Sequence, residues 1–143
     1  MDSNTLIELG FHEWLRVKVG VEKQAPQSKG VYAFRAPVPV KSERGSSDIM
    51  YIGRAMSERA GSYHNIRQSL REYLHPGHSR RPQRTKIRVG QKALEGGWEI
   101  SWMLTDSPDK TECELLRRFY REHSQLPPEN IRWPPGCKPL DEY

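Results

Sequence analysis

Glu112 is the residue whose position most strongly suggests chemistry. It begins a helical stripe of apolar residues with the spacing i+3, i+4, i+7 and i+8, namely Leu115, Leu116, Phe119 and Tyr120. A carboxylate on the covered side of a helix is costly unless it is paired or binds a cation. A first-turn glutamate also complements the helix dipole, so Glu112 is either a metal ligand or a helix-start residue. Glu114 needs no such choice, because Thr111 as N-cap with Glu114 three residues later is a capping box.

Two tyrosines each stand beside a glycine, in the tripeptides Gly30-Val31-Tyr32 and Tyr51-Ile52-Gly53. Both tripeptides lie in short apolar runs that are typical of β-strands. Tyrosine is a common strand residue, and cross-strand packing is one interpretation of the pair.

A run of basic side chains lies at residues 75–94, with no acidic residue among them: Arg80, Arg81, Arg84, Lys86, Arg88 and Lys92. Such a run is either a solvated loop or a surface that contacts phosphates without reading base sequence. The chain as a whole has 23 Lys and Arg against 18 Asp and Glu, a formal charge of +5. This excess favours an anionic partner, nucleic acid first.

The hydrophobic periodicity predicts the elements that must position these residues. In chain order they are a helix at residues 4–17, strands at 31–34 and 49–52 joined by a polar loop at 37–48, a helix at 66–74, a strand at 98–104, and a helix from Thr111 to about His123. This order is typical of a small α+β domain.

The length of 143 residues predicts one domain. We expect a helical extension at residues 1–24, the domain proper at 25–132 and a proline-rich tail at 133–143. No apolar run approaches the roughly 18 residues that span a bilayer, so no membrane association is expected. The first residues lack a signal sequence, and the two cysteines form no CxxC pair. The sequence therefore predicts a cytoplasmic protein of a reducing compartment, without a disulfide scaffold or structural zinc.

Five further features follow one another in a recognisable order. They are Ala25-Pro26 ahead of Gly30-Val31-Tyr32-Ala33-Phe34-Arg35, then Tyr51-Ile52-Gly53-Arg54-Ala55, a helix from Asn65 to Leu74 that contains Tyr73, Glu112 with Leu115 and Leu116, and Pro127-Pro128-Glu129-Asn130. This ordered set resembles the GIY-YIG nuclease family over residues 25–130, about three quarters of the chain.

The resemblance implies a three-stranded antiparallel sheet flanked by helices, which cuts one phosphodiester strand with a single Mg²⁺ or Mn²⁺ ion. It implies that Glu112 is the only protein ligand of that ion, which suits a cation that keeps its waters. Tyr32 would be the general base and Tyr51 would orient water and phosphate. Because a phenol near pKa 10 is a poor base at neutral pH, nearby cations must favour the phenolate, and Arg54 is the expected source. Asn130 would brace the site.

The sequence departs from the family pattern in three places. The gap between the tyrosines is long, and a second insertion lies at about residues 57–64. The helix position of the family's phosphate-binding arginine is occupied by Ser69. Arg67 and Arg71 lie two residues to either side, about 200° around the helix, so that a shifted helix or Arg59 must supply the guanidinium, or activity is weakened. Arg67 is retained as a catalytic candidate, and the nucleic-acid-binding candidates are Arg71, Tyr73, Arg80, Arg81, Arg84, Lys86 and Arg88.

Three functions are consistent with the sequence. The first is a metal-dependent DNA endonuclease, and the second is a nucleic-acid-binding module that kept the scaffold and lost activity. The third is a partner-binding domain that uses the proline-rich tail. DNA is the expected substrate, with RNA as an alternative, and the oligomeric state is left open, a dimer included.

Overall fold

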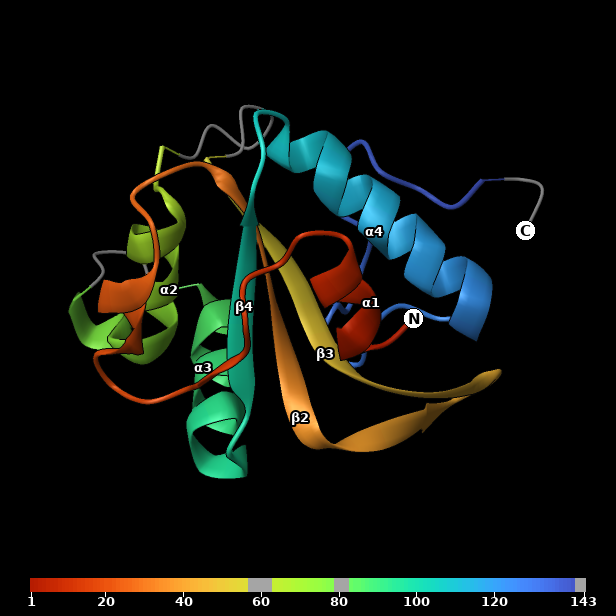
Figure 1. Ribbon diagram of the computed structural model, residues 1–143, viewed down its shortest axis with the longest axis horizontal. Helices are drawn as coiled ribbons and strands as arrows, with labels where there is room; N and C mark the ends of the chain where they lie inside the picture. Colours follow the sequence, from red (N-terminus) through yellow and green to blue (C-terminus); the bar gives the residue numbers. More distant parts are fainter. Residues whose placement is uncertain (57–62, 79–82, 141–143) are drawn as a thin grey trace.

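The computed structural model describes residues 1–56, 63–78 and 83–140 and shows an α+β fold (Figure 1). Arg59, Arg80 and Arg81, which the sequence singled out, lie outside the described residues. The helices and strands are α1 (Ser3–Glu8), β1 (Leu15–Arg16), β2 (Gly30–Ser42), β3 (Gly45–Ala55), α2 (Ile66–Leu74), α3 (Arg84–Gly96), β4 (Glu99–Leu104) and α4 (Pro108–His123), with short 3₁₀ turns at Val21–Gln24 and Pro76–His78.

The sheet has four strands in the order β1-β4-β2-β3, and every neighbouring pair is antiparallel. The expectation of three strands is therefore wrong, because β1 adds a short edge strand to β4. Its residues were predicted to continue the first helix. Gly10 has a φ of +110°, a left-handed conformation that ends α1 and lets Leu15 pair with Ile100.

The long β2–β3 hairpin corrects the loop expected at residues 37–48. Val40 pairs with Ser47 and Ser42 with Gly45, so only two residues form the turn, although the register shifts between Arg35 and Val40. This outer part of the hairpin lies near the C-terminal end of α4, where the Ser42 hydroxyl is 2.8 Å from Nδ1 of His123 (Figure 1). Because it covers no core, its strands lack the alternating apolar pattern by which strands are recognised in a sequence.

Helices cover both faces of the sheet, with α2 and α3 on one side and α1 and α4 on the other (Figure 1). Alternate residues of β2 point to opposite faces. Tyr32 and Phe34 pack in the core beneath α2 and α3, whereas Val31 and Ala33 pack in the core beneath α1 and α4. The sheet edge at β3 is consequently where side chains from both layers can meet.

Helix α3 was not among the predicted elements, since its sequence had been interpreted as a charged run. Its buried residues are small or β-branched, Val89, Gly90 and Ala93, and give a weak apolar stripe. Gly90 allows close packing against α2: a Cβ at this position would lie 2.0 Å from the backbone oxygen of Tyr73. A glycine therefore sets the distance between α3 and α2.

Replacing Gly90 with valine is expected to lower the free energy of unfolding by about 2–3 kcal/mol, because the neighbour is backbone and cannot rotate away. Urea denaturation followed by circular dichroism measures the loss. Gln91→Val is the control, since Gln91 is exposed in the same helix and helix propensity alone would favour Gly90→Val over Gln91→Val. Equal stability of the two variants would contradict the close helix contact.

Helix α4 begins at Pro108, with Ser107 as N-cap, three residues before the predicted start. The capping box of Thr111 and Glu114 is therefore wrong: Thr111 is inside the helix, and its hydroxyl lies 3.0 Å from that of Thr105. The longer helix adds Asp109 to its first turn. Proline at the first helical position is common because it needs no hydrogen-bond partner there.

Cys113 in α4 and Cys137 form a disulfide, whereas the sequence predicted a protein of a reducing compartment without a disulfide scaffold. The bond ties the C-terminal segment to α4 next to Glu112. Among the described residues, no helix combines the length and apolar character needed to cross a membrane.

Candidate active site

The strand register brings the two glycine–tyrosine tripeptides together. Tyr32 pairs with Gly53, and Tyr51 pairs with Phe34, so both tyrosines point toward α2 and α3 in diagonal positions. A Cβ on Gly53 would lie 2.6 Å from the Tyr32 ring, so this ring can occupy its place only because its neighbour is glycine. The glycines therefore have a steric role in placing the tyrosines.

A chain of phenols connects the tyrosines through α2. The Tyr32 hydroxyl lies 2.8 Å from the hydroxyl of Tyr73, and the Tyr73 ring packs against Tyr51 with the ring centroids 6.2 Å apart. Tyr32 and Tyr73 are each only 2% exposed, whereas Tyr51 is half-buried. Tyr73, proposed from the sequence as a nucleic-acid contact, is thus a core residue, and Tyr51 is the tyrosine within reach of a ligand.

The electrostatics of the tyrosines differ from the expectation that cations stabilise a Tyr32 phenolate. Burial and the neighbouring Tyr51 raise the pKa of Tyr32 well above its usual value, so Tyr32 is protonated at neutral pH. Burial also raises the pKa of Tyr51, but Arg54 and Arg88 act on it in the opposite direction. Arg54 and Arg88 therefore favour the phenolate form of Tyr51, not that of Tyr32.

Glu112 faces inward as predicted and is 4% exposed. Its Oε1 accepts a hydrogen bond of 2.6 Å from Nη1 of Arg54, and Nε of the same arginine lies 2.6 Å from Oδ1 of Asp109. Burial raises the pKa of Glu112 to about 7, although Arg54 favours the ionised form. Arg54 is thus the partner of two carboxylates on α4, not of Tyr32.

Asn130 closes the free edge of β3 beside Tyr51. Its Oδ1 accepts a hydrogen bond from the backbone nitrogen of Ile52, and its Nδ2 donates to the backbone oxygen of Ile52, both at 2.9 Å. The backbone nitrogen of Glu129 donates to the oxygen of Met50, also at 2.9 Å. A side chain thus satisfies backbone groups that an edge strand otherwise leaves unpaired.

The arginines of α2 do not line the cavity beside Glu112. Ser69 is buried against the core, and Arg67 donates a hydrogen bond of 2.8 Å to the backbone oxygen of Ala25. Arg71 lies on the exposed side of the helix. None of these three residues contributes to the cavity beside Glu112. Lys86, expected to contact phosphate, instead forms an ion pair of 2.9 Å with Glu72.

Helix α3 supplies the guanidinium groups instead. Arg84 and Arg88, one helical turn apart, line the same cavity as Tyr51 and Glu112. Arg88 donates from Nε to Oε1 of Glu129 at 2.9 Å and from Nη2 to the backbone oxygen of Glu129 at 3.0 Å. Its Nη1 makes no hydrogen bond within the part of the chain that the structure describes. A cation held in this way is oriented and still has a donor for a ligand.

The cavity beside Glu112, at the free edge of β3, is called the β3-edge cavity. It has a volume of about 390 Å³ and is formed by four segments of the chain. Its lining comprises Tyr51, Arg54, Arg84, Thr85, Arg88, Glu112, Glu129, Asn130 and residues 131–135. Six residues predicted as catalytic or nucleic-acid-binding therefore meet here: Tyr51, Arg54, Arg84, Arg88, Glu112 and Asn130.

The sequence interpretation missed Asp109, Glu129 and the wall at residues 131–135. Asp109 lies three residues before Glu112, a spacing that places both on one helix face, but the predicted helix began too late to include it. The i, i+4 spacing of Arg84 and Arg88 was a comparable signal in α3. No sequence signal indicated that Glu129 would pair with Arg88, because this contact joins segments 41 residues apart.

The carboxylates suit a hard divalent cation. Asp109 and Glu112 offer oxygen donors that contact one shared guanidinium, and magnesium sites need only one or two protein carboxylates. Within the described ranges no cluster of three or more metal-ligating side chains occurs. The residues present therefore fit a site completed by water and phosphate oxygens.

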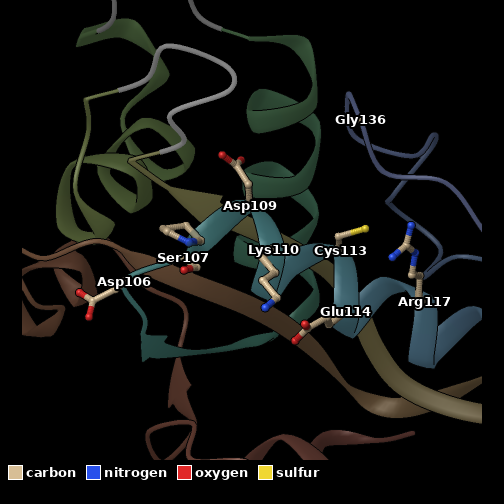
Figure 2. Close-up of a pocket in the computed structure, with 9 residues that line it drawn as sticks. Asp106, Ser107, Asp109, Lys110, Cys113, Glu114, Arg117 and Gly136 are labelled. Carbon is tan, nitrogen blue, oxygen red and sulfur yellow. The ribbon is translucent and has the colours of Figure 1, made fainter.

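A wider cavity of about 750 Å³ lies at the start of α4 (Figure 2). Asp109, Lys110 and Glu114 line it with other charged residues, although the Asp109 carboxylate points away from the side chains of Lys110 and Glu114 (Figure 2). Among the described residues, no predicted catalytic side chain contributes to this cavity. The site is therefore placed at the β3 edge.

The β3-edge cavity combines a buried carboxylate, a half-buried phenol and arginines from two directions. Comparison with protein-family models, curated proteins and solved structures found no match. The function is therefore argued from the arrangement of these side chains.

Proposed function

We propose that this protein is a metal-dependent endonuclease that hydrolyses phosphodiester bonds in DNA, with a site of the GIY-YIG type. The observation that carries the proposal is the single cavity shared by Tyr51, Glu112 and Arg88, which come from a strand and two different helices. A buried carboxylate beside guanidinium groups provides sites for a cation and for a phosphate anion at once. A metal ion and guanidinium groups are two of the means by which enzymes stabilise the charge that develops on a phosphoryl group.

Glu112 and Asp109 are the residues that would hold Mg²⁺ or Mn²⁺. The ion, when bound, would supply positive charge for the developing negative charge on the phosphate. Arg54 offsets part of the negative charge of the two carboxylates, and Asn130 fixes the strand that carries Tyr51. Each of these residues acts from a position set by backbone or ion-pair contacts.

Tyr51 is the phenol that we assign to the water and the phosphate, because it lines the cavity. Tyr32 supports it through Tyr73 instead of contacting the substrate directly. This assignment differs from the roles that the family resemblance implied, in which Tyr32 is the base. The fully buried ring and the raised pKa of Tyr32 are the physical reasons.

Arg88 is the residue that we assign to the scissile phosphate, with Arg84 at the exposed side of the cavity. An arginine on α3 would thus replace the one that is absent from α2 at Ser69. The guanidinium of Arg88 is close enough to influence the pKa of Tyr51, and Glu129 holds its orientation. Guanidinium geometry suits bidentate binding of phosphate oxygens.

Incubation of the purified protein with labelled single-stranded, duplex, flap and junction DNA tests the proposal. The expected result is cleavage of at least one substrate with Mg²⁺ or Mn²⁺, and no cleavage after chelation of the metal. The same panel made of RNA establishes which nucleic acid is cut. No cleavage of any substrate with either metal would contradict the proposal.

The cleavage rate is expected to rise with pH through about 7, because the metal needs the ionised form of Glu112 and burial raises its pKa to that value. Protons and metal compete for this carboxylate. A tenfold higher Mg²⁺ concentration should therefore move the midpoint down by up to about one pH unit. Rates measured between about pH 5.5 and 8.5 at two metal concentrations test this prediction. The same midpoint pH at both metal concentrations would contradict it.

A nucleic-acid-binding module without cleavage is the second candidate, and one contact favours it. Arg54 binds Glu112 at 2.6 Å and also contacts Asp109, so a guanidinium already occupies both carboxylates that would hold the metal. This function predicts binding whose logarithm falls linearly with the logarithm of salt concentration, and no cleavage with any divalent ion. The cleavage panel separates the two candidates.

A further inference from the structure

The β3-edge cavity adjoins a second cavity, and the two share one short segment of the chain as lining. The second cavity has a volume of about 770 Å³, and both are lined by residues 130–133. Tyr120 and Trp133 line the second cavity, with ring centroids 5.4 Å apart and planes inclined at 59°. Trp133 therefore borders both spaces.

The β3-edge cavity is lined by two groups of residues that differ in chemistry. Arg84 and Arg88 form a cationic wall, whereas Trp133, Pro134 and Pro135 form an apolar one. Arginines that meet phosphates and aromatic rings that stack with bases are the two components with which proteins bind single-stranded nucleic acid. Arg132, which lines both cavities, adds a third cation beside Trp133.

The size of the cavity limits what can enter it. A volume of about 390 Å³ is near the lower end of the range for small-molecule sites, a size that suits one nucleotide. The bases of a duplex are stacked on each other inside the helix. A base can reach the Trp133 ring only if it has left that stack.

The apolar wall is held in place at both ends. Asn130 binds the backbone of Ile52, and Cys137 is bonded to Cys113. Beyond the disulfide, Nε of Arg117 donates to the backbone oxygen of Lys138 at 2.9 Å. A ring fixed in this way loses little conformational entropy when a ligand binds.

We propose that this site binds an unpaired strand, with the base next to the bound phosphate stacked on Trp133 and the strand continuing into the second cavity. The substrate class is thus single-stranded DNA or the unpaired arm of a branched DNA. The proposal rests on the proposed function for the location of the phosphate, but it concerns binding and is tested without cleavage.

The test measures fluorescence anisotropy of labelled ligands with the metal chelated. The ligands are an oligo(dT) of about ten nucleotides, an abasic oligomer of equal length and charge, and a duplex of the same length. The wild-type protein should bind oligo(dT) at least about tenfold more tightly than the abasic oligomer, since stacking on an aromatic side chain contributes about 1–3 kcal/mol per base. The duplex should bind more weakly than oligo(dT).

Trp133→Leu keeps an apolar side chain in the wall and removes the aromatic face. It should weaken oligo(dT) binding about tenfold and leave binding of the abasic oligomer unchanged. Trp133→Phe should restore most of the affinity. Trp98→Leu is the matched control, because Trp98 is half-buried and lines neither cavity, and it should change neither affinity.

Two results would overturn the proposal. One is an equal loss of affinity for oligo(dT) and for the abasic oligomer in Trp133→Leu, which would indicate that Trp133 only maintains the structure. The other is tighter binding of the duplex than of oligo(dT) by the wild-type protein. Absence of cleavage together with the expected binding would refute the nuclease but leave the unpaired-strand site intact. Cleavage of continuous duplex together with no dependence on Trp133 would support the nuclease and refute the unpaired-strand site.

Discussion

Replacing Glu112 with glutamine is expected to lower the rate of DNA cleavage by at least about 10³-fold, because a metal ion contributes several kcal/mol to stabilisation of the transition state and the amide is a poor ligand for it. The substitution keeps the shape of the side chain and its acceptor for Arg54. It also removes a carboxylate whose charge burial disfavours. The protein should therefore remain folded, and circular dichroism verifies this.

Glu114→Gln is the control for this variant. Glu114 is exposed on the same helix and lies outside the β3-edge cavity, so its substitution should leave the rate unchanged. Cleavage rates of both variants under single-turnover conditions give the comparison. Wild-type activity in Glu112→Gln would show that the carboxylate has no part in the reaction and would favour a different site.

Replacing Arg88 with glutamine is expected to lower kcat by about 10²- to 10³-fold, the second large effect. The loss follows from removal of a guanidinium that stabilises charge on the transferring phosphoryl group. Arg88→Lys should recover only part of it, because an ammonium cannot make the planar two-point contact. Steady-state kinetics separate kcat from KM for each variant.

Lys92→Gln is a closely matched control for Arg88→Gln. Lys92 lies one turn further along α3 and binds the same Glu129, at 3.0 Å, but it does not line the cavity. If Arg88 acted only by holding Glu129 and the tail, the two variants would lose similar activity. A kcat near the wild-type value in Arg88→Gln would contradict our assignment of the phosphate to α3.

The sequence predicted the parts of the site whose positions depend on local periodicity. Glu112 was expected to face inward from the helical spacing of its neighbours, and it is buried. Tyr32 and Tyr51 were expected in adjacent strands, and they occupy diagonal positions of one hairpin. Both inferences use repeats of two or 3.6 residues, which the backbone imposes wherever the element forms.

The elements that were missed lack such a repeat. Helix α3 contributes mainly Val89, Gly90 and Ala93 to the core, a stripe too small to stand out among its charges. Strand β1 has two residues and exists because Leu15 and Arg16 meet the edge of β4. Their structure depends on partners distant in the chain, which no local pattern records.

By itself, the sequence determined the α+β class, the hairpin with its two tyrosines and the buried carboxylate, since each follows from the pattern of side chains along one element. Only the tertiary structure decided which cations face that carboxylate and which tyrosine reaches the cavity. Arg54 pairs with Glu112 across the β3 edge, and Gly90 brings α3 close enough to α2 for Arg88 to stand beside Tyr51. The physical reason is that electrostatic and steric contacts act over a few ångströms in space, so they depend on packing between segments and not on separation along the chain.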